Sequence, residues 1–172
     1  DAGLLAILTG MGSLSYGELA GERIKLGLLL HDPEEEHDCF SDNTHNSHYY
    51  DQQSIRNVYL GQYTRVDGTV VSGPSISDLV AEKAPAVDEE LRAKLDATVA
   101  AMEQMRQRVQ SGEAYDQMIG EGNEAGNALI QAVVDGLVAQ TRPIERAVAE
   151  LNLGQASFEG SDSLDNPNAV FQ

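Results

Sequence analysis

Residues 85–110 carry the pattern that most limits how this chain can fold. Apolar side chains recur there three or four positions apart, which places them on one face of an α-helix. They are Leu91, Leu95, Val99, Met102, Met105 and Val109. Pro85 suits the first turn of such a helix, and Ser111-Gly112 ends it. A long helix with a single apolar face has to pack against other helices, as in a bundle.

Three further segments are predicted to be helical, from apolar spacing or from their capping residues. They cover residues 2–31, 42–60 and 123–151. Asp42 and Thr44 are good N-caps for the second of these helices, and Gly61 stops it. Aromatic residues make up only 5% of the chain, which favours helices over a sheet. The 172 residues therefore predict one all-α domain, a four-helix-bundle-like lobe.

Two local signals refine the helices. Ser75 and Asp78 form a capping-box signature for a short helix that reaches Lys83. Pro143 lies inside the last helical pattern, so we expect a kink or a break near residues 140–142.

A hairpin signal separates the helices at 44–60 and 85–110. Two β-prone runs, residues 63–66 and 69–71, flank the pair Asp67-Gly68. An Asp-Gly pair between such runs is typical of a tight hairpin turn. The sequence therefore predicts a small β-hairpin insertion in the bundle.

Six glycines weaken the first helical segment, because each costs about 1 kcal/mol relative to alanine. They are Gly3, Gly10, Gly12, Gly17, Gly21 and Gly27. Since glycine lets a neighbouring backbone approach, we expect this helix to have close packing partners. Residues 155–172 are rich in Gly, Ser, Asp and Asn and are expected to be irregular.

The chain is strongly acidic, with 28 acidic against 11 basic residues and a formal net charge of −17. Nucleic acid binding requires a positive surface that displaces counterions, so we expect no nucleic acid partner. Anionic lipid is disfavoured for the same reason, whereas cations are attracted. The single cysteine excludes an internal disulfide bond. Residues 2–14 are apolar but too few to span a bilayer.

Residues 34–45 and the positions just after them concentrate the chemistry-bearing side chains. The candidate donors are Glu36, His37, Asp42, His45 and His48. Carboxylate and imidazole groups suit iron, zinc or a similar divalent ion. The plainer interpretation is a solvated loop in which Asp42 and Thr44 only cap the next helix. Cys39 has no oxyanion-hole motif beside it, so we assign no catalytic residue.

Glu22 and Arg23 precede this loop on the first helix. Adjacent opposite charges are most simply a surface ion pair, which contributes little to stability. The alternative is that Glu22 or Arg23 points into a cavity beneath the loop.

Several segments together resemble the imelysin-like family of iron-regulated proteins. They are Gly21-Glu22-Arg23-Ile24, residues 36–45 with the core Ser41-Asp42-Asn43-Thr44-His45, Asn57-Val58-Tyr59-Leu60-Gly61, and residues 159–164. The resemblance implies that residues 1–172 are the C-terminal half of a protein built from two helical-bundle lobes, with a site in the cleft between them. The family's Gly-x-His-x-x-Glu signature belongs to the N-terminal lobe, and this sequence does not contain it.

The resemblance also implies roles for individual residues. By position, it implies ligand binding by Glu22, Arg23 and Asp42 and metal binding by Glu36, His37 and His45. The expected metal is iron, with zinc as the alternative. His48 does not match the family pattern and has a weaker claim to be a ligand.

Location and function follow as further expectations from the resemblance. We expect a bacterial protein of the periplasm or the cell surface, partnered by the N-terminal lobe. Peripheral membrane attachment would lie before Asp1, which fits the start of a processed protein or a fragment. The leading function is iron acquisition, by binding an iron species or a peptide-like ligand between the lobes. The alternatives are a zinc-dependent metallopeptidase and a non-enzymatic adaptor with a purely structural loop.

Overall fold

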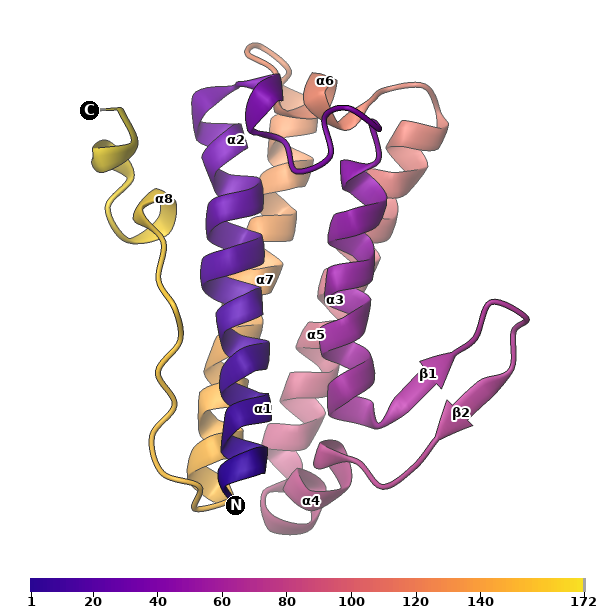
Figure 1. The fold of residues 1–172 in the computed structure, drawn as a ribbon, viewed down its shortest axis with the longest axis vertical. Helices are drawn as coiled ribbons and strands as arrows, with labels where there is room; N and C mark the ends of the chain where they lie inside the picture. Colours follow the sequence, from indigo (N-terminus) through magenta and orange to yellow (C-terminus); the bar gives the residue numbers. More distant parts are fainter. Residues whose placement is uncertain (172) are drawn as a thin grey trace.

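Helical rods form a bundle in the computed structural model, which describes residues 1–171 (Figure 1). The first rod is α1 (Ala2–Ser13), η1 (Leu14–Lys25) and α2 (Leu26–Leu30) in direct succession. The other rods are α3 (Thr44–Leu60), α5 (Pro85–Gln110) and α7 (Glu124–Glu150). The predicted four-helix-bundle-like fold is confirmed.

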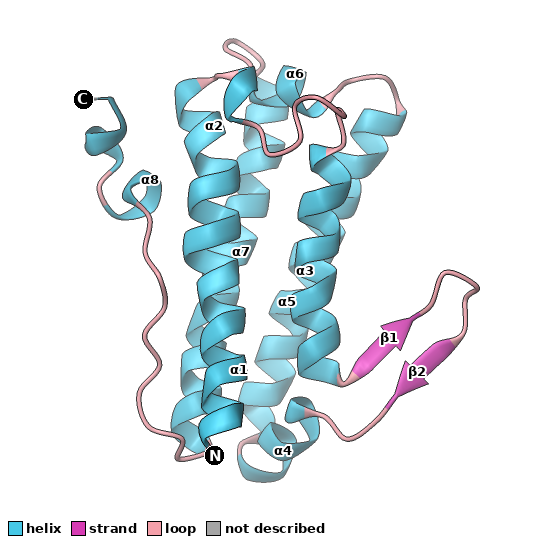
Figure 2. Ribbon diagram, viewed as in Figure 1, coloured by secondary structure: helices cyan, strands magenta, loops and turns pink. Residues whose placement is uncertain are grey.

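Shorter elements join and flank the rods. They are η2 (Pro33–Glu35), β1 (Gln62–Thr64), β2 (Val70–Ser72), α4 (Ile76–Lys83), α6 (Tyr115–Ile119), α8 (Asp162–Asp165) and η3 (Pro167–Phe171). The two strands pair antiparallel, with Gln62 opposite Ser72, and confirm the predicted hairpin (Figure 2). Ser75 and Asp78 form the predicted capping box at the start of α4.

The middle of the first rod is a π-helix rather than the α-helix that the sequence predicts. Leu14, Leu19 and Ile24 are five residues apart, and Leu19 and Ile24 are completely buried. Five residues drift away from one face of an α-helix, whereas the wider turn of a π-helix, with its i→i+5 bonds, keeps them closer together. Such widened turns are rare and occur often at functional sites.

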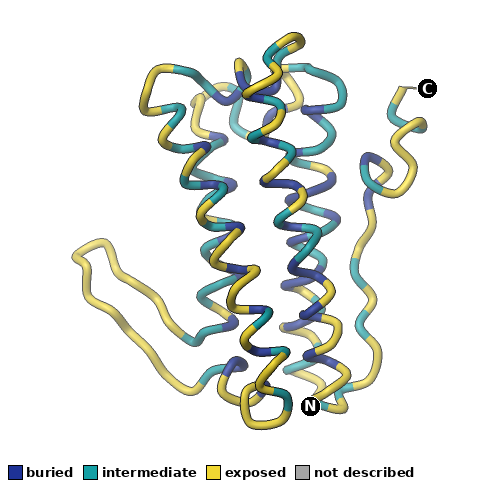
Figure 3. Tube along the Cα trace, turned by 180° about the vertical axis from the view of Figure 1, so that it is seen from behind, coloured by how far each residue is buried: buried dark blue, intermediate teal, exposed yellow. Residues whose placement is uncertain are grey.

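The core of the bundle is divided by a layer of buried polar side chains. The apolar cluster toward the hairpin contains Leu8, Ile55 and Leu91, and the cluster toward the α2–α3 loop contains Leu19, Met102 and Val133. Gln52, Gln140 and Ser15 lie between them. Figure 3 shows buried positions recurring along the length of the rods. Within residues 1–171, no helix combines the length and apolarity needed to cross a membrane.

Hydrogen bonds satisfy this polar layer. The Gln52 and Gln140 amides bond to each other at 2.8 and 3.0 Å, and Gln140 also donates to Ser15 Oγ at 2.8 Å. Ser15 donates onward to the Leu137 carbonyl at 2.7 Å. Because buried amides without partners are costly, this network specifies how the first rod, α3 and α7 align.

The C-terminal segment explains the glycines at positions 12 and 17 of the first rod. Residues 152–161 run alongside that rod (Figure 1). A Cβ on Gly12 would lie 2.1 Å from the Phe158 ring, and one on Gly17 would lie 2.6 Å from the Glu159 carbonyl oxygen. The expected close packing partner is therefore this tail, which is irregular apart from α8 and η3.

The structure contradicts a break in α7 and the predicted caps of α3. α7 runs through Pro143 without a break, because buried residues on both sides, such as Leu137 and Ile144, hold the helix against its neighbours. α3 is not capped by Asp42 or Thr44. Asp42 adopts a positive φ of 50°, and Thr44 Oγ1 instead accepts a hydrogen bond from the Asp38 amide at 3.0 Å.

Candidate functional site

The loop between α2 and α3 crosses one end of the bundle (Figure 1) and places Glu36 inside it. Glu36 is only 7% exposed, and its Oε2 atom has no hydrogen-bond partner. Burial raises the pKa of this carboxyl, and the nearby Asp116 raises it further, while the Thr44 hydroxyl lowers it in part. Glu36 is thus a buried acid that is easier to protonate than a surface glutamate.

His48 lies beneath the loop on α3 and is completely buried. Its ring stacks on that of His37 with 6.2 Å between centroids and lies edge-on to Tyr115 at 5.4 Å. Neither ring nitrogen of His48 has a hydrogen-bond partner. Burial lowers the pKa of His48 to about 3, helped by His37 and the positive charge of Arg23, so the imidazole is neutral at pH 7.

Arg23 reaches the loop from the π-helical part of the first rod. Its Nη1 atom contacts both ring nitrogens of His37, with 3.0 Å to Nε2, and its Nη2 donates to Glu18 at 3.4 Å. The expected ion pair with Glu22 does not form. Glu22 Oε1 instead accepts a hydrogen bond from Ser161 Oγ at 2.6 Å. The structure therefore brings Arg23 to the loop and turns Glu22 toward the tail.

His45 and Asp42 occupy the start of α3. The Nδ1 atom of His45 is buried without a partner. Burial lowers the pKa of this imidazole, and Arg106 lowers it further, while Asp42 opposes both. Asp42 itself is exposed.

A pocket of about 490 Å³ opens beside these residues. Its lining includes His37, Asn46, Asp51 and Arg106. Burial raises the pKa of the Asp51 carboxyl, and Arg23 and His37 oppose that rise. Arg106 Nε donates to Asn46 Oδ1 at 2.9 Å, which holds α5 against α3 at the rim. The pocket presents both donors and acceptors to solvent.

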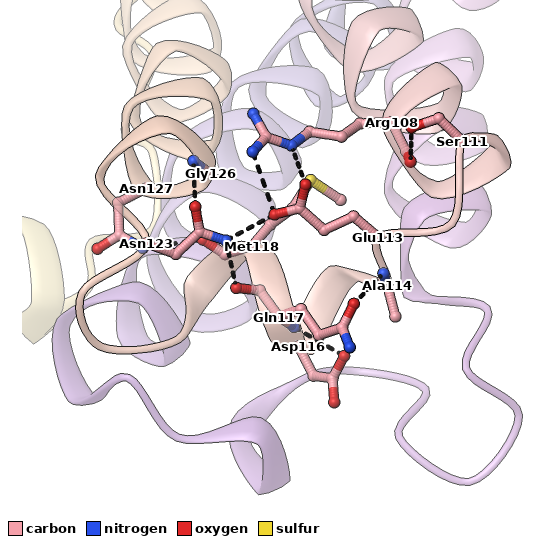
Figure 4. A network of polar contacts seen from close by, with 10 residues as sticks. All are labelled: Arg108, Ser111, Glu113, Ala114, Asp116, Gln117, Met118, Asn123, Gly126 and Asn127. Carbon is pink, nitrogen blue, oxygen red and sulfur yellow. Dashed lines mark hydrogen bonds and ion pairs between the residues drawn. The ribbon is translucent and has the colours of Figure 1, made fainter.

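A second polar network holds α6, the helix that carries Tyr115, in place under the loop (Figure 4). The Glu113 carboxylate accepts hydrogen bonds from Arg108 Nε at 2.5 Å and Nη2 at 3.1 Å, and from Asn123 Nδ2 at 2.6 Å. Asn123 Oδ1 in turn accepts from the Gly126 amide and caps α7. This network ties α5, α6 and α7 together.

The three predicted metal-binding residues supply suitable donors but not a complete centre. Across residues 1–171, no group of three or more His, Cys, Asp or Glu side chains is arranged to hold a metal ion. Glu36 and His45 each keep one unpartnered buried atom, whereas both ring nitrogens of His37 contact Arg23. The donor types fit iron or zinc, but further ligands would have to come from elsewhere.

Sequence reasoning undervalued two residues of this site. His48 lies three positions after His45, on the same face of a helix, and this spacing was its only signal. Tyr115 carried no signal, because a tyrosine in a short segment is indistinguishable from a surface residue until the fold buries it.

Comparison with known proteins identifies the family of this chain. The family model of imelysin matches residues 1–144. None of the curated proteins compared matches the chain. The family match covers most of the bundle, including the loop, α3 and α5, and agrees with the resemblance in the Glu22, Asp42 and Tyr59 segments. The chain therefore belongs to the imelysin family.

Proposed function

We propose that this chain is one lobe of a bacterial iron-uptake protein of the imelysin type, which binds iron or an iron-bearing ligand where its loop end meets a second lobe. The periplasm or the cell surface is the proposed location. Family membership supports a protein of the metallopeptidase or iron-regulated kind.

The observation that carries the proposal is where unsatisfied polar atoms gather. Among residues 1–171, the buried side-chain nitrogen and oxygen atoms without partners belong to one end of the bundle. They are Arg23 Nε, Glu36 Oε2, His45 Nδ1, both ring nitrogens of His48 and the Tyr115 hydroxyl. Folded proteins rarely tolerate such atoms, because each costs free energy unless a ligand, a water or a partner satisfies it.

The chemistry of these atoms favours a metal ion held jointly with other groups. Carboxylate and neutral imidazole are good ligands for iron, and the net charge of −17 raises the local concentration of cations. Arg23 sits beside His37 and opposes a bare cation there, so a complex with an anionic portion fits the pocket better than a free ion.

Titration of the full-length protein with ferric citrate, an iron complex with an anionic portion, tests the proposal. We expect a dissociation constant tighter than about 1 mM and at least about tenfold weaker binding in Glu36→Gln and in His45→Ala. Glu35→Gln is the matched control, because Glu35 is an exposed carboxylate on the same loop. A dissociation constant above about 1 mM would reject the proposal. An equal loss of iron affinity in Glu36→Gln and Glu35→Gln would reject it as well.

A zinc-dependent peptidase is the second candidate, and the peptidase name of the matched family favours it. In that case the second lobe would supply zinc ligands, and buried Glu36 is the candidate proton acceptor of this lobe. Cleavage of an unfolded protein substrate that a chelator blocks and zinc restores, and that Glu36→Gln abolishes, would support this function over iron binding alone.

A further inference from the structure

The β-hairpin stands away from the bundle (Figures 1 and 2), and all residues of its two strands are exposed. Tyr63 is 53% exposed and Val70 is 54% exposed. A two-stranded hairpin in water is marginally stable without a third strand or a packing surface. The hairpin therefore offers a strand edge to a partner.

The register shows which backbone groups face outward. Hydrogen bonds join Gly73 to Gly61 and Arg65 to Thr69 at the two ends of the ladder. Since bonded and non-bonded pairs alternate in an antiparallel ladder, the Tyr63–Val71 pair is bonded and the flanking pairs are not. The N–H and C=O groups of Gln62 and Thr64 therefore point away from β2.

A groove of about 400 Å³ lies along this free edge, between β1 and α3. Its lining includes three tyrosines and three arginines but no aspartate or glutamate. They are Tyr49, Tyr50, Tyr63, Arg56, Arg65 and Arg106. In a chain with 28 acidic and 11 basic residues, such a lining marks the groove as a local exception to the acidic surface.

The arginines in the groove are held in different ways. The Arg106 guanidinium carbon lies 4.3 Å from the centroid of the Tyr49 ring, which fixes it over an aromatic face. Arg56 pairs with Asp96 at 2.7 Å and Arg106 pairs with Glu103 at 2.9 Å, whereas Arg65 makes no ion pair within residues 1–171. Tyr and Arg are also the side chains most enriched at binding hot spots.

We propose that an acidic, extended polypeptide segment binds in this groove by adding to β1 as a third strand. Its backbone would bond to the outward N–H and C=O groups of Gln62 and Thr64, and a carboxylate of the segment would meet Arg65. Pairing with a strand edge requires the partner segment to be extended, and the arginine lining favours a segment with negative charge. The groove shares Tyr50 and Arg106 with the pocket beside the α2–α3 loop, but the strand edge and Arg65 belong to the groove alone, so the proposal does not depend on iron binding.

A pair of proline variants tests the proposal. Thr64→Pro removes the outward N–H of β1 but keeps the inward bonds at Tyr63 and Arg65. Val70→Pro is the matched control, because Val70 faces Thr64 and its N–H points out of the opposite edge. Fluorescence anisotropy of the full chain with a labelled hexapeptide of alternating Glu and Val measures binding.

We expect the acidic peptide to bind wild type and Val70→Pro alike, and Thr64→Pro about tenfold more weakly. Arg65→Gln should weaken binding as well, and added salt should reduce the affinity. A matched peptide with Lys in place of Glu should not bind. Circular dichroism and thermal unfolding verify that both proline variants remain folded.

Several results would overturn the proposal. The proposal is rejected if the acidic peptide does not bind or if the Lys peptide binds equally well. It is also rejected if the two proline variants lose the same amount of affinity for the acidic peptide. Preferential binding of a single-stranded oligothymidylate would identify the groove as a nucleic acid site instead. A dimer in sedimentation velocity that Thr64→Pro dissociates would identify a second copy of the chain as the occupant.

Discussion

The imidazole of His48 lies edge-on to the phenol of Tyr115, with 5.4 Å between the ring centroids and 74° between the planes. Among the described residues, neither the ring nitrogens nor the hydroxyl has a hydrogen-bond partner. Burial raises the pKa of Tyr115 and lowers that of His48, so both rings are uncharged at pH 7. The His48 ring nitrogens and the Tyr115 hydroxyl are therefore uncharged hydrogen-bonding groups without a partner at this end of the bundle.

Replacing His48 by Phe should remove a pH dependence of stability. The unfolded imidazole titrates near pH 6.5 and the folded one near pH 3, so between these values only the unfolded state binds the proton. Falling pH therefore lowers the free energy of unfolding of wild type by about 1.4 kcal/mol per pH unit in that window, and the His48→Phe variant lacks this slope.

Urea denaturation at several values between about pH 7 and pH 4 measures the His48 contribution. His31→Asn is the control, because His31 is not among the groups that shift the pKa of His48 and its positive φ of 51° suits asparagine, so the slope should remain. Stability profiles for wild type and His48→Phe that run parallel would contradict the assignment of this pH dependence to His48.

Adding a methyl group at Gly17 should loosen the C-terminal tail. Because the new Cβ would lie 2.6 Å from the Glu159 carbonyl oxygen, Gly17→Ala should lower the free energy of unfolding by about 1–3 kcal/mol. Gly10→Ala has open space around its Cβ and should instead raise it by up to about 1 kcal/mol. Chemical denaturation of both variants gives the comparison, and limited proteolysis should cut the tail of Gly17→Ala sooner. Equal effects at the two glycines would be inconsistent with close packing of the tail.

The Glu113 carboxylate should stabilise the fold mainly above acidic pH. Hydrogen bonds from Arg108 and Asn123 hold its pKa below the usual value of 4.5. This contribution is present above the unfolded-state pKa and is lost as the pH falls through the lower folded-state value. Glu113→Gln should therefore be less stable than wild type near pH 7, and the difference should narrow in acid. Thermal unfolding across pH checks this, with exposed Glu121→Gln as the control, and a difference that stays constant with pH would refute it.

The Tyr59 hydroxyl should stabilise the fold by donating a hydrogen bond to the buried carboxylate of Asp88. Tyr59 donates to Asp88 Oδ1 at 2.8 Å, and Ser77 donates to the same atom at 2.5 Å. Tyr59→Phe removes one donor from a carboxylate that is only 7% exposed and should cost about 1–3 kcal/mol in urea denaturation. Tyr63→Phe, at a half-exposed side chain, should change little. Equal stability of Tyr59→Phe and wild type would mean that Ser77 alone satisfies Asp88.

Local patterns predicted most elements of the fold because they depend on residues within a turn or two. Pro85, the Ser75 and Asp78 capping box and the Asp67-Gly68 turn each gave the correct element. The local predictions that failed were those in which contacts with distant residues outweigh the local preference. Packing around Pro143 keeps α7 whole, and the fold of the loop uses Thr44 to hold Asp38 rather than to cap α3.

For the candidate site, the sequence by itself determined residue types and neighbourhood: imidazoles and carboxylates near the α2–α3 loop, on a helical bundle of the imelysin family. Only the tertiary structure decided that Arg23 meets His37 while its neighbour Glu22 meets Ser161, and that His48 is buried without a partner. The physical reason is that local spacing sets which side of a helix a residue occupies, whereas burial and partners depend on elements up to 139 positions away.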